Sequence, residues 1–376
     1  MSNPVTLLIL LSCFCLLLMA IRFYKASLSK EIYSPSLEKP CQETIVAILP
    51  FRNEAETIGN TLPILIDEAS LDGNCRLILV DSDSNDHGSS LAEDILVDSV
   101  LKNEMWNIIS VNEPGKCKAL NAAMQLVGND EFVVIVDADA KISNGSFEIF
   151  RNWMADSEIG AVSAQEAVSA EHPMGEYKRR SNILRKYEST IGSCIVLEGS
   201  LLAWHPYRIG WEYFDELSNA DDAQISLSAI RSGHRSIVDP SIVYHDTRKE
   251  NRGFLKRSIR RSQGLSKQLI KNSDLLFVPE FYSIRGTMFF NILLHLIIPW
   301  CILFLLFSPL LIISNGYQPI VFSFLEIISI LPSIILLTSL LSRVGRSLIK
   351  GSIASVVGQF RLMLKIRSHQ WEPGGG

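Results

Sequence analysis

Apolar residues gather at the two ends of the chain, whereas the middle has the mixed pattern of a soluble domain. Residues 5–21 are almost wholly apolar, and Arg22, Lys25 and Lys30 follow them. A cleavable signal peptide has its basic residues before the apolar run and a small-residue cleavage site after it, and this segment has neither. The pattern therefore predicts an uncleaved membrane anchor over residues 1–25, at the short end of the length that crosses a bilayer.

Two longer apolar runs, residues 288–313 and 319–341, lie near the other end of the chain, and each is long enough to cross a membrane. An uncharged turn separates them, and basic residues follow the second run. Because basic residues are enriched on the cytoplasmic side of a span, both ends of the chain predict a cytoplasmic domain between them. Residues 351–366 are short and partly polar, which favours a helix in the membrane interface.

The middle of the chain alternates between short apolar runs rich in β-branched residues and stretches with helical spacing. The runs at 44–50, 76–80 and 132–136 are typical of buried strands, and residues 54–69 and 89–101 have the pattern of helices. Strands that alternate with helices form a parallel sheet covered on both faces. We therefore expect an α/β fold with a mostly parallel sheet, flanked by transmembrane helices at both ends of the chain.

Polar side chains follow each of the three expected strands at its carboxyl end, where open α/β sheets bind their ligands. A structural protein would not need this repetition at three separate strand ends, so the pattern favours a binding site. The polar residues at these ends are Arg52, Asn53 and Glu54, then Asp81 and Asp83, then Asp137 and Asp139.

The Asp137 and Asp139 pair is the sharpest local signal for chemistry. In an extended backbone, residues two apart point to the same side, so both carboxylates can face one ligand. Their oxygens suit a hard cation such as Mg²⁺ or Mn²⁺, which would bridge and neutralise a diphosphate leaving group. A solvated turn is the alternative, and the five apolar residues directly before Asp137 favour the metal site. His245 follows a strand-like segment and is a further candidate ligand, although a lone histidine is more often structural.

Composition narrows the choice of function and compartment. The net charge is −5, which gives no support for nucleic-acid binding. The seven cysteines include no CxxC pair and no metal-like spacing with histidine. Scattered single cysteines are typical of a reducing compartment and predict no disulfide framework.

Six segments of the middle domain, in this order, resemble those of family-2 glycosyltransferases with a GT-A fold. Each segment is modest alone, but six in the family's order are specific, and the resemblance extends over roughly residues 44–265. Within the second segment, Ser82 stands where the family has a second aspartate. The segments are 48–54, 80–86, 115–121, 136–139, 199–203 and the pair of Asp221 with Asp222.

The resemblance implies a nucleotide-sugar donor, a divalent cation and inversion at the transferred sugar. It implies that Gly199 and Asp221 lie on the acceptor side, that Asp222 is the catalytic base, and that Asp139 holds the metal with Asp137. Donor-binding residues implied in the same way are Pro50, Arg52, Asn53, Glu54, Asp81, Asp83, Lys116 and Asp137.

Physical chemistry gives an independent reading of Asp221 and Asp222. Two adjacent carboxyls repel one another, which raises the pKa of one of them toward that of a useful base. Residues 225–230 have helical spacing, so an aspartate here can also cap a helix, and Asp221 could do so while Asp222 does the chemistry. A phosphate acceptor is already anionic and needs no base, so a base at Asp222 favours a hydroxyl acceptor.

A basic segment precedes the apolar runs near the C-terminus. Within it, Arg257 or Arg260 could stabilise the diphosphate charge that develops as the sugar leaves. A basic helix on anionic lipid head groups is the competing interpretation, and both can hold. Processive members of the resembled family carry Q-x-x-R-W here. The corresponding residues 257–261 have neither Gln nor Trp, which favours transfer of a single sugar.

The expected function is transfer of one sugar from a nucleotide-diphosphate sugar to a lipid or glycan hydroxyl, by a multi-pass protein of the membrane. The alternatives are a processive polysaccharide synthase, a membrane scaffold without turnover, and a nucleotidyltransferase that consumes a nucleoside triphosphate. The expected division is an anchor (1–25), a linker (26–43), a GT-A catalytic domain (44–246), a basic interfacial segment (247–285), a transmembrane hairpin (286–342) and a cytoplasmic or interfacial tail (343–376).

Overall fold

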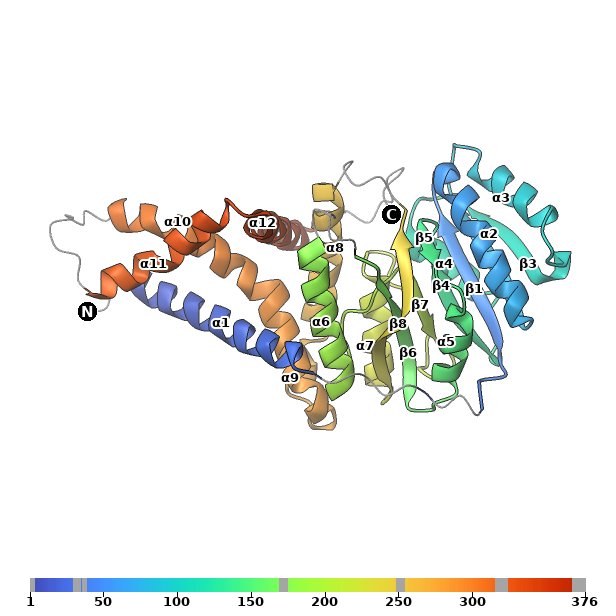
Figure 1. Ribbon diagram of the computed structural model, residues 1–376, viewed down its shortest axis with the longest axis horizontal. Helices are drawn as coiled ribbons and strands as arrows, with labels where there is room; N and C mark the ends of the chain where they lie inside the picture. The colour runs from blue at the N-terminus through green and yellow to red at the C-terminus, as the bar shows by residue number, and fades with distance from the viewer. Residues whose placement is uncertain are drawn as a thin grey trace.

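The computed structural model describes residues 4–29, 35, 39–168, 175–247, 254–314 and 324–366. An α/β domain lies at one end of the molecule and a group of apolar helices at the other (Figure 1). Two helices, α6 (Gly175–Ile191) and α8 (Phe254–Lys271), lie between these two parts.

The α/β domain is built on one 8-stranded sheet with the order β3-β2-β1-β4-β7-β6-β8-β5. The half that contains β3, β2, β1 and β4 is entirely parallel, as the sequence predicts. Antiparallel pairings begin where β7 joins β4, but β6 and β8 are again parallel, so four of the seven pairings among the described strands are parallel. The strands are β1 (Thr44–Phe51), β2 (Cys75–Ser82), β3 (Trp106–Val111), β4 (Glu131–Val136), β5 (Ala140–Ile142), β6 (Ile159–Glu166), β7 (Leu201–Trp204) and β8 (Arg235–Asp246).

Helices cover both faces of the sheet, which explains why its central strands are continuous apolar runs. One apolar core joins alternate residues of β1 and β4 to α2 (Ala55–Asp72), α3 (Gly88–Val97) and α5 (Ser146–Met154). The residues that point the other way pack on α4 (Lys116–Met124) and α7 (Asp221–Arg231). The predicted α/β class with helices on both faces is confirmed.

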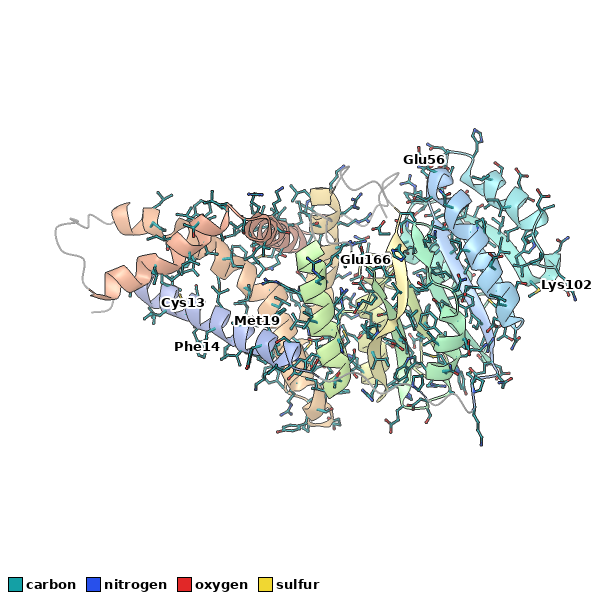
Figure 2. All side chains as sticks on the ribbon, in the orientation of Figure 1. Cys13, Phe14, Met19, Glu56, Lys102 and Glu166 are labelled. Atoms are coloured by element: carbon teal, nitrogen blue, oxygen red, sulfur yellow. The ribbon has the colours of Figure 1, made fainter. Side chains whose placement is uncertain are left out.

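The apolar part contains two helical segments long and apolar enough to cross a membrane, Val5–Ser27 and Pro279–Leu310, among the described residues. A bent pair, Leu331–Ser339 with Val344–Met363, would make a third if it acts as one span. Figure 2 shows the side chains of Cys13, Phe14 and Met19 along the first segment. The predicted turn between the two C-terminal runs lies largely outside the described residues. The helices are α1 (Pro4–Ser27), α9 (Arg285–Ile292), a π-helical turn (Leu293–Ile297), α10 (Ile298–Ser314), α11 (Phe324–Ser339) and α12 (Arg343–Met363).

Two glycines allow neighbouring backbone to approach helix α8 closely, one on each of two sides. A Cβ atom at Gly358 of α12 would lie 2.9 Å from the backbone oxygen of Ile259 in α8. A Cβ atom at Gly264 of α8 would lie 2.9 Å from the backbone nitrogen of Asn219, in the loop that leads into α7. Within the predicted basic segment, α8 is therefore covered by α12 and supports the start of α7.

Helix α1 contacts α6 and α9 through a buried arginine. Arg22 is 6% exposed, and its guanidinium lies over the rings of Tyr187 and Phe290 at 4.5 and 4.8 Å. Its Nη2 atom is 3.8 Å from Glu188 Oε1. The Glu188 carboxylate also accepts a hydrogen bond of 2.8 Å from Asn291 Nδ2 of α9. One polar cluster therefore joins α1, α6 and α9.

Candidate active site

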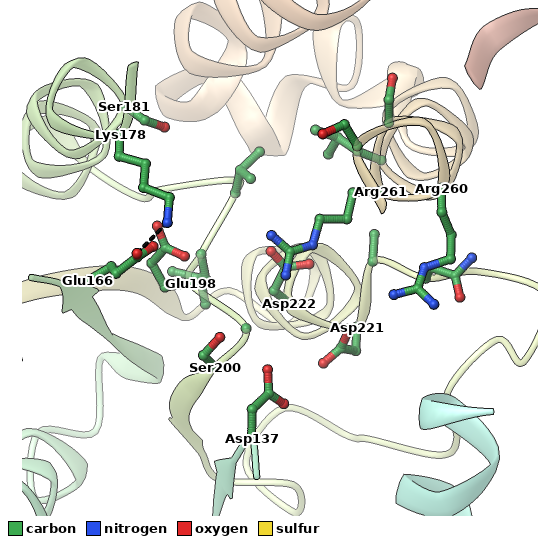
Figure 3. Close-up of a pocket in the computed structure, with 18 of the residues that line it drawn as sticks. Asp137, Glu166, Lys178, Ser181, Glu198, Ser200, Asp221, Asp222, Arg260 and Arg261 are labelled. Atoms are coloured by element: carbon green, nitrogen blue, oxygen red, sulfur yellow. Dashed lines mark hydrogen bonds and ion pairs between the residues drawn. The ribbon is translucent and has the colours of Figure 1, made fainter. Parts of the chain in front are cut away.

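A cavity of about 340 Å³ lies at the carboxyl ends of β1 and β4, between the α/β domain and the apolar helices. Figure 3 shows its charged side chains, with Asp222 near the centre. It brings together residues that are far apart in the sequence. The predicted site residues that line it are Pro50, Glu54, Lys116, Asp137, Asp139, Gly199, Asp221, Asp222 and Arg260.

Asp137 and Asp139 lie in a turn rather than in the extended backbone that the sequence pattern assumes. The Ala140 N–H donates to the Asp137 carbonyl over 2.9 Å, which closes the turn between β4 and β5. The Asp137 N–H donates to the Ser200 carbonyl, and the Asp139 carbonyl accepts from Thr247. These backbone bonds place both aspartates against the same cavity.

Lys116, the first residue of α4, is the centre of the charged network. Its Nζ atom is 2.7 Å from Asp137 Oδ1 and 2.9 Å from Asp221 Oδ2. It also donates to the Gly199 carbonyl over 3.2 Å. Burial lowers the pKa of the ammonium group, but the attraction of the two carboxylates outweighs burial and raises that pKa above its ordinary value. Lys116 therefore remains a cation and holds four segments of the chain together.

Asp222 has the electrostatic environment of a general base. Burial, followed by repulsion from Asp221, raises the pKa of the Asp222 carboxyl to about 7. The predicted rise in pKa for one member of the pair is confirmed in direction, with burial as the larger cause. Ala220 occupies the cap position of α7, and no side chain caps it, so the helix-capping role considered for Asp221 is wrong. Asp221 instead binds Lys116.

The loops after β1 and β2 bind one another beside the cavity. Arg52 Nη2 is 3.7 Å from Asp83 Oδ2. The backbone of Asn53 donates to Ser84 Oγ over 3.0 Å, and Asp81 Oδ1 accepts from the Ser84 N–H over 3.0 Å. Arg52, Asn53, Asp81 and Asp83 are not among the residues that line the cavity. In this structure they shape the rim at the carboxyl ends of the two strands.

Ser82, the departure from the family's acidic segment, has a structural task in this chain. Its hydroxyl accepts a hydrogen bond of 2.9 Å from the Gly115 N–H and donates to the Glu113 carbonyl over 3.3 Å. Gly115 immediately precedes α4. The serine therefore helps to fix the position at which Lys116 enters the cavity.

The structure does not bring His245, the further candidate metal ligand, to the cavity. His245 is exposed on β8 and pairs in register with Lys141. Side chains alternate along a strand, so His245 points away from the face that carries Tyr244 and Asp246. These two neighbours line the cavity, whereas His245 does not. Asp246, one position further on, is the carboxylate that the sequence interpretation missed.

The donor set of the cavity fits a cation that is shared with a diphosphate. Within the described part of the chain, no group of three His, Cys, Asp or Glu side chains forms a complete metal cage. Mg²⁺ and Mn²⁺ seldom need one beside a nucleotide, because one or two carboxylates and phosphate oxygens suffice. Asp137 and Asp139 supply such carboxylates at the cavity wall.

Arg260 and Arg261 of α8 also line the cavity, whereas Arg257, one turn earlier, does not. Figure 3 shows Arg260 on the side of Asp222 opposite to Glu166 and Lys178. Of the two arginines that the sequence proposes for the diphosphate, the structure therefore brings only Arg260 to the cavity.

A further polar group on the cavity wall has no signal in the sequence pattern. Lys178 of α6 pairs with Glu166 at the end of β6, and Arg185 of α6 pairs with Glu198. Each pair joins residues 12 or 13 positions apart across a change of element. No local motif identifies such pairs, because they form only when α6 packs over the sheet.

The comparisons with known proteins agree with this geometry. Residues 46–206 match the sequence profile described as glycosyl transferase family 2. A search of curated proteins found no match. Among solved structures, the chain is similar to the mannosyltransferase PcManGT from Pyrobaculum calidifontis, solved with GDP-Man and Mn²⁺. That similarity has a TM-score of 0.78 and 21% identity, and it covers 96% of this chain and 99% of that one. TarS from S. aureus gives a weaker TM-score of 0.44 at 13% identity, covering 85% of this chain and 91% of TarS.

The fold is of the GT-A type that this solved glycosyltransferase, PcManGT, has. The residues that match the glycosyl transferase family 2 profile, 46–206, run from β1 to β7 of the sheet.

Proposed function

We propose that the protein transfers a single sugar from a nucleotide-diphosphate sugar to a hydroxyl of a lipid-linked acceptor at the cytoplasmic face of a membrane. One observation carries the proposal. A single cavity is lined by Asp137, Asp139 and Lys116, by Asp222, and by residues of the apolar helices.

The donor side of the cavity suits a nucleoside diphosphate. When bound, Mg²⁺ or Mn²⁺ held by Asp137 and Asp139 would neutralise negative charge on the diphosphate. Lys116 keeps Asp137 and Asp221 in fixed positions. Arg260 brings a positive charge to the same cavity, where it favours the charge that develops on the leaving group. The rim formed by the loops after β1 and β2 is the proposed site for the nucleoside.

Asp222 is proposed to remove the proton of the acceptor hydroxyl as that oxygen attacks the anomeric carbon. The new bond joins the acceptor oxygen to this carbon, and the bond from the carbon to the phosphate oxygen breaks. The nucleoside diphosphate leaves with the bonding electron pair. A direct displacement of this kind inverts the configuration of the sugar.

The position of the cavity supports an acceptor that approaches from the bilayer. Asn291 and Leu294 line it from the apolar segment Pro279–Leu310, and Ala354 lines it from α12. Basic residues follow the first apolar helix, which favours a cytoplasmic location for the α/β domain. The absence of the processive signature in residues 257–261 supports transfer of one sugar.

The test is release of nucleoside diphosphate and labelling of lipid by the full chain in lipid nanodiscs. A panel of nucleotide sugars, which includes GDP-mannose, is supplied with Mn²⁺, with Mg²⁺ or with EDTA, and with membrane lipid extract as acceptor. Asp139→Ala and Asp222→Asn are compared with the wild type, and Asp98→Asn, an exposed carboxyl outside the cavity, is the matched control.

The proposal predicts one preferred donor, metal-dependent transfer to lipid, and loss of transfer in both site variants but not in the control. Transfer that persists in Asp222→Asn would remove the assignment of the base. No release from any donor would contradict the proposed reaction, and long glycan products would favour a processive synthase.

A further inference from the structure

One wall of the cavity carries charged side chains that donor binding does not use. On this wall Lys178 pairs with Glu166, and Arg185 pairs with Glu198. Tyr244 Oη donates to the second Glu198 oxygen, Oε2, over 3.3 Å. Figure 3 shows Glu166, Lys178, Ser181 and Glu198 together on one side of Asp222, with Arg260 on the other side. We call Glu166, Lys178, Arg185, Glu198 and Tyr244 the α6 wall.

The charges of the α6 wall are balanced. Each of its cations is paired with a carboxylate, and Glu188 adds another carboxyl to the same side of the cavity. An incoming phosphate would face these carboxylates at close range, which is unfavourable where water is excluded. Paired carboxylates and guanidinium groups instead offer fixed hydrogen-bond acceptors and donors to a neutral molecule with many hydroxyl groups.

Apolar side chains complete the surroundings that a sugar ring needs. Leu184 of α6 lines the cavity together with Val196 and Leu197, which precede Glu198. Ligand sites usually combine such apolar surface with a few placed polar groups, and a pyranose ring presents both C–H and O–H surfaces. From this wall the cavity continues to Leu294 and Ala354 of the membrane helices.

We propose that the α6 wall is an acceptor subsite that binds a sugar, so that the acceptor already carries at least one sugar before transfer. This inference rests on the proposed function. The bound sugar presents one hydroxyl to Asp222, and its lipid-linked end extends toward the membrane helices. The proton goes to the Asp222 carboxylate, and the new glycosidic bond joins two sugars.

The experiment compares acceptors and wall variants in nanodiscs, with the donor identified by the nucleotide-sugar panel. The acceptors are a polyprenyl phosphate, a polyprenyl-diphosphate saccharide and the same saccharide without lipid. The variants are Glu166→Gln, Lys178→Met and the double variant, with Lys186→Met, a residue of α6 outside the cavity, as the matched control. Thermal melting with and without nucleoside diphosphate checks that each variant is folded and binds the donor.

We expect transfer to the saccharide acceptors and none to polyprenyl phosphate. The wall variants should raise the KM for the saccharide roughly tenfold or more beyond any change in the donor KM, because a buried hydrogen-bonding partner is lost. A lower KM with the lipid-linked saccharide than with the free one identifies the lipid as part of the acceptor. Transfer to polyprenyl phosphate, or equal changes in donor and acceptor KM, would overturn the subsite.

A binding measurement separates failure of the subsite from failure of the proposed function. The free saccharide is titrated calorimetrically into the wild type and into Glu166→Gln in the presence of nucleoside diphosphate. Binding that weakens in the variant, without transfer from any donor, would support the subsite and contradict the proposed reaction. Transfer to a lipid phosphate with no saccharide binding would keep glycosyl transfer and remove the subsite.

Discussion

Two adjacent carboxyls in the cavity, those of Asp221 and Asp222, have different electrostatic environments. Asp221 is bound by Lys116 Nζ at 2.9 Å. Asp222 is buried beside that negative charge, and the pKa of its carboxyl is raised to about 7. Burial is the larger cause of this rise, and the ion-paired neighbour Asp221 adds to it, which suits the role proposed for Asp222 as the base.

The first prediction concerns the pH dependence of transfer. Because Asp222 must be ionised to accept a proton, kcat/KM should rise with pH through about 7 and level off above that value. The measurement is initial rate against pH at saturating metal. Asp222→Asn should reduce transfer by roughly 10²- to 10⁴-fold and abolish this rise. A wild-type profile that is flat across neutral pH would contradict the assignment.

The second prediction concerns stability at the same carboxyl. The pKa of Asp222 is raised in the folded state, so the folded protein binds a proton that the unfolded chain has lost above its ordinary pKa of 3.8. The stability that this proton contributes is lost as pH rises through about 7. The melting temperature of Asp222→Asn minus that of the wild type should therefore be larger at about pH 8 than at about pH 5. Asp98→Asn is the control. A melting-temperature difference between Asp222→Asn and the wild type that is the same at both pH values would contradict the prediction.

At the scale of helices, the start of α7 depends on how closely α8 approaches it. Gly264 leaves no room for a Cβ atom beside the backbone of Asn219 and Ala220, at 2.9 and 3.1 Å. Ala220 immediately precedes the Asp221 and Asp222 pair. A small displacement of α8 is therefore transmitted to the carboxyls.

The third prediction follows from this contact. Gly264→Ala should displace the loop before α7 and lower kcat more than it changes the donor KM, since backbone cannot yield as a flexible side chain does. The matched control is Gly59→Ala in α2, where nothing lies within 4 Å of the new Cβ atom. Steady-state kinetics of the two variants, with melting curves, provide the test. Equal kinetics for both would show that the contact has no influence on the site.

The fourth prediction concerns the contact of α1 with α6. Burial raises the pKa of the Glu188 carboxyl to about 7, although Arg22 and Asn291 oppose the rise. Arg22→Met removes the nearby positive charge and should lower the free energy of unfolding by up to roughly 3–5 kcal/mol. Adding Glu188→Gln should recover part of this loss, because the double variant no longer has a buried carboxyl without its nearby cation. Melting curves of the two single variants and the double variant give the coupling, and Lys25→Met, an exposed residue of α1, is the control. Additive losses would indicate that the pair does not interact.

At the scale of the whole molecule, the cavity lies where the α/β domain meets the apolar helices. Its walls come from the sheet, from α6 and α8, and from helices of the apolar part. In Figure 2, Glu166 lies at this junction, on the side of the sheet that faces the helices. A bilayer around the apolar helices would hold the reaction close to its surface.

The fifth prediction concerns orientation in the membrane. Lys102 has a side chain that is 78% exposed, and it lies at the end of the domain remote from the apolar helices (Figure 2). A Lys102→Cys variant should react with a membrane-impermeant maleimide only after cells are permeabilised, if the domain is cytoplasmic. The wild type, which has its own cysteines, is the control. Labelling in intact cells would reverse the proposed orientation.

The sequence by itself determined the features that depend on neighbours along the chain. The expected strands 44–50, 76–80 and 132–136 correspond to β1, β2 and β4, because burial on both faces requires an unbroken apolar run. The apolar run from which an anchor was expected over residues 1–25 is a helix, Val5–Ser27, that is long and apolar enough to cross a membrane. The acidic groups at the strand ends were also visible, since a parallel sheet collects such ends at one edge.

Tertiary structure decided which of these groups meet and which other groups join them. Lys116 contacts Asp137 and Asp221, which lie in other elements far along the chain, and no spacing rule connects the three. Asp246 lines the cavity and the adjacent His245 does not, because only one face of β8 turns toward the cavity. The α6 wall exists only because α6 packs over the end of the sheet and aligns its cations with carboxylates there. Local pattern fixes where a side chain lies along an element, whereas packing fixes what that side chain faces.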